Sequence, residues 1–193
     1  MIHPILAYGH PILRQKSKRI EADFPGVGQL VDEMWETMRR ANGCGLAASQ
    51  IGLGKRLFIV DSRTTFDHLD EHDRGVYFDP GDKGIMETFI NATIVERSED
   101  IWEDEEGCLS IPGLARTVKR NRCIKIQYVN KDFEPRIAGF GAMTARMIQH
   151  EYDHTEGILF LDYLKPITRK FLESRLRKIK KGQVETKYPM KFI

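Results

Sequence analysis

Hydrophobic residues recur at intervals of three and four positions in two segments of the chain, the spacing that places them on one face of an amphipathic helix. Residues 26–42 carry this pattern up to an Asn-Gly dipeptide, which favours the end of a helix. Residues 141–155 carry it again, and Gly157 follows where a left-handed C-cap would end the helix. A third helix is predicted over residues 168 to about 181. The sequence therefore predicts an N-terminal, a central and a C-terminal helix.

Four other runs are rich in β-branched and aromatic residues, which favour strands. These runs are residues 56–61, 85–97, 123–130 and 134–140, the last two joined in a hairpin around Lys131-Asp132. We predict an α+β fold in which mixed or antiparallel strands pack around the central helix. At 193 residues, the chain 1–193 is expected to form a single domain.

Residues 64–84 interrupt the predicted strands with a stretch rich in Asp, Gly and His that has no regular hydrophobic period. We expect this stretch to be a long excursion on the surface. His68 and His72 have the four-residue spacing of metal ligands on a helix, but no apolar helical face surrounds them. A second metal site is therefore not expected there.

Charge and composition exclude broad classes of partner. Thirty Lys and Arg residues against 28 Asp and Glu residues give a formal net charge of +2, too small for a general attraction to nucleic acid or acidic membranes. No window approaches the roughly 18 apolar residues of a membrane-spanning helix, and no export signal is apparent. Three cysteines are too few for a disulfide framework. We expect a cytoplasmic protein with no membrane contact and no sequence-specific nucleic-acid partner.

The run HEYDH at residues 150–154 has the spacing of a metal site on the central helix. Residues four apart lie one above the other on a helix, so His150 and His154 can direct imidazole nitrogens at one ion. Glu151 projects about 100° around the helix axis and is placed to accept a proton from water rather than to bind the ion. The pattern predicts a metal-dependent enzyme that hydrolyses an amide bond.

A catalytic site of this kind needs a third protein ligand and one position open to water. Phe160 stands where one group of HExxH enzymes has a third histidine, and its ring cannot bind metal. Glu173 lies among basic residues on a predicted surface helix, where we expect a solvated carboxylate. Cys123 alternates with isoleucines in a strand and is interpreted as a small buried residue. Cys108, in the polar run EEGCLSIPG with a turn at its glycine, remains as the candidate ligand.

Three ordered runs together resemble peptide deformylases: GCGLAASQIG at residues 43–52, EEGCLS at 105–110 and QHEYDH at 149–154. The motifs of that family are G-x-G-L-A-A-x-Q, E-G-C-L-[SA] and Q-H-E-x-D-H, and each fixed position is matched. The opening YGHPILRQ is similar to the family's N-terminal segment, so the resemblance covers nearly the whole chain. It implies a catalytic domain that removes the formyl group from the N-terminal formyl-methionine of nascent polypeptides and releases formate.

The resemblance also implies a metal and the residues that work beside it. The implied ligands of one divalent ion are Cys108, His150 and His154. Ferrous iron is expected, with zinc, nickel or cobalt as substitutes. Glu151 would carry the proton, while the Gln50 amide and the Leu109 backbone N–H would stabilise the developing negative charge.

By the same resemblance, the substrate peptide lies beside Gly43, Cys44 and Gly45, with Cys44 as a wall of the pocket. Met143 and Met147 would line the hole for the substrate's methionine side chain. A plain core role fits the two methionines about equally well.

Glu106, in the second motif, is expected at the site and, by pairing with Arg120, would brace the segment of Cys108. Two positions depart from the family pattern. Asp104 stands where relatives often carry an apolar pocket residue, and Ala115 stands where some carry an arginine. These departures bear on the side-chain preference rather than on the chemistry.

Other functions stay open on the sequence alone. A peptidase would use the same ion and base on an internal peptide bond, so an assay of both substrates separates the two activities. Residues 165–181 carry eight basic residues against the single Glu173, and such a helix could touch RNA. A charged run is more often a solvated face. By similarity, a basic C-terminal extension docks some deformylases on the ribosome.

Overall fold

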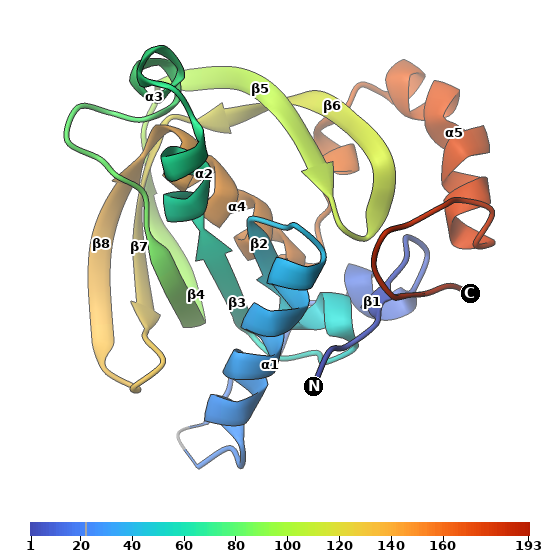
Figure 1. Ribbon diagram of the computed structural model, residues 1–193, viewed down its shortest axis with the longest axis horizontal. Helices are drawn as coiled ribbons and strands as arrows, with labels where there is room; N and C mark the ends of the chain where they lie inside the picture. Colours follow the sequence, from blue (N-terminus) through green and yellow to red (C-terminus); the bar gives the residue numbers. More distant parts are fainter. Residues whose placement is uncertain (22) are drawn as a thin grey trace.

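A five-stranded sheet with helices on both faces forms the body of the protein (Figure 1). The computed structural model describes residues 1–21 and 23–193. The strand order is β2-β3-β4-β7-β8, and every neighbouring pair is antiparallel. The bounds are β2 Gly45–Ala47, β3 Leu57–Asp61, β4 Met86–Arg97, β7 Cys123–Val129 and β8 Pro135–Gly141. The predicted α+β class is confirmed, as is the hairpin formed by β7 and β8.

Helices α1 (Val27–Arg40) and α4 (Ala142–Glu156) cover opposite faces of this sheet. Successive side chains of a strand point to opposite faces, and β3 uses both. Its residues pack alternately with α1 (Leu57, Ile59) and with α4 (Phe58, Val60). The central helix predicted from the sequence is α4, which packs against this sheet.

A long hairpin of β5 (Ile101–Cys108) and β6 (Ile111–Asn121) packs against α4 and forms a separate two-stranded sheet (Figure 1). The sequence patterns did not predict these two strands. The β5 run IWEDEEGC is dominated by acidic residues. Buried and less buried positions alternate along the strand, but the residue types at these positions do not alternate between apolar and polar, so the sequence shows no strand pattern. Leu109 and Ser110 form the connection at the tip of the hairpin.

The three predicted helices are present, with boundaries that differ by one or two residues. They are α1, α4 and α5 (Pro166–Lys180). Gly157 caps α4 with a φ of 75°, as expected for a left-handed C-cap. Pro166 occupies the first turn of α5, a position that favours proline, and the helix therefore begins before residue 168.

Two short helices, α2 (Ser62–His68) and α3 (Glu71–Tyr77), lie in or at the start of the surface excursion of residues 64–84, where the sequence predicted no helix. Each helix begins at an aspartate whose side chain accepts a backbone N–H of the first turn. The cap is Asp61 for α2 and Asp70 for α3, each at 2.8 Å. Such caps stabilise a helix start in a segment too short and polar for a hydrophobic period to appear.

Cys123 is exposed, so the expectation of a small buried residue is wrong. It is the first residue of β7, in which buried and exposed positions alternate. The inward positions are Ile124, Ile126 and Tyr128. Because neighbouring side chains of a strand point to opposite faces, a residue next to a buried isoleucine points outward.

The two ends of the chain meet as a parallel pair of β1 (Ile5–Leu6) and β9 (Met190–Lys191). The part of the chain that the structure describes also contains three single-turn helices: η1 (Pro11–Arg14), η2 (Ala48–Ile51) and η3 (Phe160–Tyr163). Within the described residues, no helix combines the length and the apolar character needed to cross a membrane.

Candidate metal centre

His150 and His154 lie on successive turns of α4 and face the tip of the β5–β6 hairpin. α4 ends at Glu156 because Gly157 adopts a positive φ. Gly157 also lies close to the Arg14 backbone. A Cβ on Gly157 would come within 2.7 Å of the Arg14 carbonyl group. The sequence thus fixes the end of the helix one turn beyond His154 and holds that turn against the N-terminal segment.

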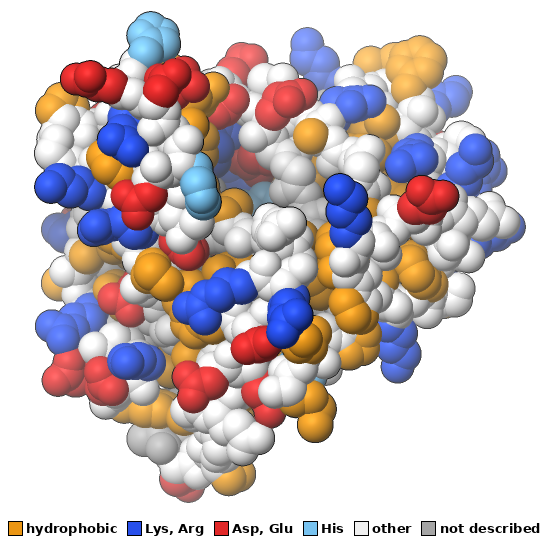
Figure 2. Space-filling model, viewed as in Figure 1, with side chains coloured by type: hydrophobic (Ala, Val, Ile, Leu, Met, Phe, Trp, Pro, Cys, Tyr) orange, Lys and Arg blue, Asp and Glu red, His pale blue; other side chains and the backbone are white. Residues whose placement is uncertain are grey.

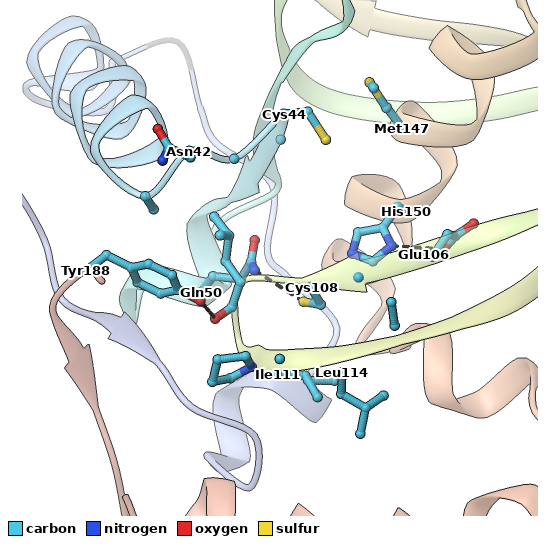
Figure 3. Close-up of a pocket in the computed structure, with 18 of the residues that line it drawn as sticks. Asn42, Cys44, Gln50, Glu106, Cys108, Ile111, Leu114, Met147, His150 and Tyr188 are labelled. Atoms are coloured by element: carbon cyan, nitrogen blue, oxygen red, sulfur yellow. Dashed lines mark hydrogen bonds and ion pairs between the residues drawn. The ribbon is translucent and has the colours of Figure 1, made fainter. Parts of the chain in front are cut away.

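Cys108 is the last residue of β5 and lies close to both histidines of α4. Figure 3 shows Cys108 and His150. The register of β5 against β6 shifts between Gly107 and Cys108, which re-aims the strand at its end. The Cys108 Sγ atom lies 3.3 Å from His154 Nε2. One ligand atom each from Cys108, His150 and His154 lie within 4.8 Å of one another, and most of this cluster is buried.

This cluster is the one group of three or more potential metal ligands found among residues 1–21 and 23–193. A thiolate and two imidazoles suit zinc, iron, cobalt or nickel and leave a fourth position for water. His68 ends α2 and His72 lies in α3, so they do not share a helix. Glu173 is exposed on α5 and does not belong to the group.

Glu106 orients the His150 ring through a hydrogen bond with its Nδ1 atom. Its carboxylate lies 3.0 Å from His150 Nδ1, which leaves Nε2 of the ring to face Cys108. Arg120 donates to both Glu106 oxygens, at 2.8 and 2.9 Å, and Arg146 donates to one of them at 2.7 Å. Burial acts to raise the pKa of Glu106, but the hydrogen bonds from Arg120 and His150 outweigh it and hold that pKa well below its ordinary value. The pairing of Glu106 with Arg120 expected from the sequence is present.

A second carboxylate balances the remaining charge of this buried network. Arg120 also donates to Asp153, and the Tyr163 hydroxyl donates to the same Asp153 oxygen at 2.9 Å. The side chains of Arg120 and Glu106 are only 3% and 4% exposed. Buried charges of this kind persist only when they are paired, so Arg120 ties the hairpin to α4 through compensated charge.

Glu151 stands beside the cluster with an oxygen that no described residue satisfies. The residue is 5% exposed, and its Oε2 atom is buried without a hydrogen-bond partner among the described residues. Burial raises the pKa of Glu151 to about 7. A Cβ on Gly45 would come within 2.5 Å of Glu151 Oε1. The carboxylate therefore packs against the backbone of Gly45. Its buried Oε2 atom is suited to accept a proton from a small polar ligand.

Gln50 is 1% exposed in η2 and has a fixed orientation. Its side-chain carbonyl accepts the Ala47 N–H at 2.8 Å, which turns the amide nitrogen toward the hairpin tip. That nitrogen lies 3.6 Å from Cys108 Sγ (Figure 3). It also lies 3.3 Å from Ser110 Oγ. Leu109, between these two residues, is half-buried. The amide thus points at the space beside the metal-binding group.

A cavity of about 810 Å³ opens onto this group. It is walled by the end of α1, β2, the β5–β6 hairpin, α4 and a C-terminal segment. The expected substrate-binding residues all line it: Gly43, Cys44, Gly45, Glu106, Met143 and Met147. Met147 is also 9% exposed and packs in the core with the sheet, so its core position and its position in the cavity wall are compatible.

Arg146 and Tyr188 are two of the lining residues that the sequence motifs did not single out. Arg146 lies one turn before His150, and this four-residue spacing is a signal that could have placed it on the same face. Its guanidinium group stacks 4.4 Å from the centre of the Trp102 ring and donates to the Trp102 carbonyl. Of the two positions that depart from the family pattern, Ala115 lines the cavity and Asp104 does not. The backbone carbonyl of Asp104 accepts a hydrogen bond from Arg146.

Tyr188 is the second missed residue, and it comes from the far end of the chain. Its hydroxyl donates to the Leu109 carbonyl at 2.8 Å. Burial raises the pKa of Tyr188 to about 12, so the hydroxyl keeps its proton. No motif or local pattern at this position signals a contact with the hairpin tip.

Comparison with known proteins places this arrangement in a family. A sequence model described as "Polypeptide deformylase" matches residues 2–170. A peptide deformylase from Christiangramia forsetii is 41% identical over 194 residues, which cover 100% of this chain and 96% of that protein. A peptide deformylase from Cytophaga hutchinsonii is also 41% identical and covers 100% of this chain and 98% of its own length.

Solved structures agree with the sequence comparison. The peptide deformylase of Ehrlichia chaffeensis superposes with a TM-score of 0.81 at 29% identity, covering 95% of this chain and 99% of that one. The peptide deformylase of Thermus thermophilus superposes with a TM-score of 0.78 at 36% identity, covering 94% and 99% of the two chains.

Proposed function

The chain belongs to the peptide deformylase family and has the hydrolase activity of that family; from this premise we propose that its substrate is the N-terminal formyl-methionine of nascent polypeptides. The observation that carries the proposal is that Cys108 and His150 of the Cys-His-His group line one cavity together with Glu151, whose Oε2 atom has no hydrogen-bond partner among the described residues. The reaction adds water across the formyl amide and releases formate and a free amino terminus.

Cys108, His150 and His154 would hold one divalent ion. Such an ion supplies a Lewis acid that makes a neighbouring water more acidic and polarises a carbonyl oxygen. We propose ferrous iron as the natural ion, with zinc, nickel or cobalt as substitutes, because thiolate and imidazole suit all four. Elemental analysis of protein purified without oxygen, set against aerobically purified protein, tests this choice.

Glu151 carries the proton in the proposed reaction. Its buried carboxylate accepts a proton as water attacks the formyl carbon and then returns it to the amine that leaves. A pKa raised by burial to about 7 suits both roles at neutral pH. Close packing on Gly45 keeps the carboxylate in one position.

Gln50 and Leu109 would stabilise the oxygen that gains negative charge. The Gln50 amide is held toward the site by its bond from Ala47, and the Leu109 backbone N–H lies at the hairpin tip next to Cys108. Fixed donors stabilise developing charge without having to reorganise; loss of one such donor costs about 3 kcal/mol in the barrier.

The substrate peptide would lie along residues 43–45, where β2 is an edge strand of the sheet. An edge strand offers unpaired backbone groups, so an extended peptide can add to it. Met143 and Met147 would surround the methionine side chain with soft apolar contacts. Cys44 is exposed to the cavity as part of its wall.

The test is release of formate from formyl-Met-Ala-Ser, compared with cleavage of the internal bonds of an unformylated peptide of the same length. We expect formate from the first and no cleavage of the second; the reverse result would establish a peptidase. Glu151→Gln should keep the metal and lose almost all of the rate. Full activity in that variant would leave the metal with a purely structural role.

A contact with the ribosome is a second proposal, carried by α5. Basic side chains gather over this helix in Figure 2, and Lys170, Arg177 and Lys178 are exposed. Exposed positive charge of this kind binds a phosphate backbone in a salt-dependent manner. We propose that this face touches ribosomal RNA and that the protein acts in the cytoplasm.

Charge reversal tests this contact better than deletion does. Removal of residues 168–193 would also remove the cavity wall that follows α5. The variant Lys170→Glu, Arg177→Glu, Lys178→Glu should lose co-sedimentation with ribosomes and keep its rate on a free peptide. Unchanged co-sedimentation would contradict the proposal.

A further inference from the structure

The C-terminal return, residues 183–193, forms one wall of the cavity. After α5 the chain passes the hairpin tip, with residues 185–188 lining the cavity, and ends in β9 beside β1. Figure 3 shows Tyr188 across the cavity from Met147 and His150. The match to the family model ends at residue 170, so this wall is built by a part of the chain outside that match.

Tyr188 contacts the hairpin tip through one hydrogen bond and through packing. Its hydroxyl donates to the Leu109 carbonyl at 2.8 Å. Its half-buried ring packs against the core cluster that holds α1, and Leu109 packs against the same cluster. A Cβ on Gly43 would come within 2.7 Å of Leu109 Cδ1, so the Leu109 side chain has little room to move.

The next carbonyl of the tip is held by the N-terminal segment. The Tyr8 N–H donates to the Ser110 carbonyl at 2.7 Å. Ala7 directly follows β1, and its N–H donates to the Lys191 carbonyl of β9 at 2.9 Å, so the residue before Tyr8 is bonded to the C-terminal segment. Two consecutive carbonyls of the tip are therefore fixed by two segments that are themselves bonded to each other.

We propose that Tyr188 is a positioning residue for the deformylase reaction: its hydroxyl holds the Leu109–Ser110 peptide through the Leu109 carbonyl and thereby restrains the Leu109 backbone, whose N–H lies in the neighbouring peptide unit next to Cys108. The inference rests on the proposed role of that N–H. With the carbonyl bonded, rotation about the Leu109 backbone is restricted, and a donor held in place stabilises charge better than one that must be reoriented. Loss of the hydroxyl alone should therefore affect the rate and not the affinity for substrate.

The test compares Tyr188→Phe with Tyr128→Phe. The control removes a tyrosine hydroxyl that donates to Glu87 at 3.2 Å, away from the cavity. In Tyr188→Phe we expect kcat on formyl-Met-Ala-Ser to fall about 2- to 10-fold, the change that corresponds to one hydrogen bond, with KM within about twofold and metal content unchanged. Tyr128→Phe should keep the wild-type kcat.

Hydrogen exchange gives a readout that does not depend on activity. Backbone amides of the peptide covering residues 107–111 should exchange faster in Tyr188→Phe than in the wild type, and not in Tyr128→Phe. Unchanged exchange would overturn the inference whatever the rates are. An unchanged kcat, or a fall in kcat matched by lost metal, would also overturn it. Absence of formate release by the wild type would instead reject the proposed function, while the exchange comparison still tests the hydrogen bond.

Discussion

At Gly45 the backbone lies against the Glu151 carboxylate, and the absence of a side chain matters more than backbone freedom. A methyl group there would overlap Glu151 Oε1 at 2.5 Å. We expect Gly45→Ala to displace the carboxylate and lower kcat/KM by about 100-fold, because small misplacements of a catalytic group cost that much. Metal content should stay at the wild-type level, which elemental analysis checks alongside the formate assay.

The matched control is Gly28→Ala in α1, where an added Cβ meets nothing within 4 Å. Alanine favours a helix over glycine by about 1 kcal/mol, so this variant should be as stable as the wild type or more so, at the same rate. A Gly45→Ala enzyme with the wild-type rate would show that Glu151 does not need its present position.

Glu106 holds the buried charges together, and its removal is expected to affect both stability and metal. Glu106→Gln leaves Arg120 and Arg146 without their shared anion. We expect unfolding in urea to show a loss of about 3–5 kcal/mol and metal titration to show about 10- to 100-fold weaker binding. Glu103→Gln is the control, because the Glu103 and Lys119 side chains are 55% and 72% exposed and such pairs contribute about 1 kcal/mol or less. Unchanged metal binding in Glu106→Gln would contradict the bracing role.

At the scale of elements, periodic segments were predictable and polar ones were not. The apolar spacing of α1 and α4 predicted these two helices to within two residues, and the predicted C-terminal helix α5 agrees equally well. The β5–β6 hairpin was missed because the inward side chain of β5 at Glu106 is a buried carboxylate that bonds arginines, not an apolar residue. At Glu106 a buried ion pair takes the place of a buried apolar side chain. Arg120 and Arg146 come close to Glu106 only in the folded chain.

In the candidate site, too, the residues that stand in local motifs were predictable from the sequence and the others were not. The metal-binding residues stand in short motifs, and the geometry of a helix relates two of them directly. Tyr188 reaches the hairpin tip from a segment about 80 positions along the chain, since its bond to Leu109 spans 79 residues. Single-sequence patterns describe neighbours along a helix or strand, so a contact over such a separation has no local signature.

The helix α5 is anchored by its buried face, although most of its surface is charged. Leu172, Leu176 and Ile179 pack into a core cluster with β6 and η3. We expect Leu176→Ala to lower the free energy of unfolding by about 2–4 kcal/mol, measured by urea titration, because it leaves a cavity in that cluster. Phe171→Ala should change it by less than about 0.5 kcal/mol, since Phe171 is 79% exposed. Equal effects of the two would mean that α5 is not docked as described.

For the molecule as a whole, the metal-binding group joins two parts that are otherwise linked by packing and charge. Cys108 comes from the hairpin, whereas His150 and His154 come from the helix against the main sheet. An ion bound by both parts stabilises the folded state by mass action, by about 2.7 kcal/mol when its concentration is 100 times the dissociation constant. The prediction that 1–193 acts as one catalytic domain requires that this effect reach the whole chain.

Removal of the metal should therefore lower the melting temperature of the entire protein in a single transition. A chelator added to the wild type is expected to lower Tm by about 5 °C or more, measured by calorimetry, and excess metal should restore it. Cys108→Ala removes the ligand that the hairpin contributes, so its Tm should respond little to chelator. Cys123→Ala changes an exposed thiol outside the group and should keep the full response. Two separate transitions in the chelated wild type would show that the hairpin and the main sheet unfold independently, and a full response in Cys108→Ala would show that the ion is held without the thiolate.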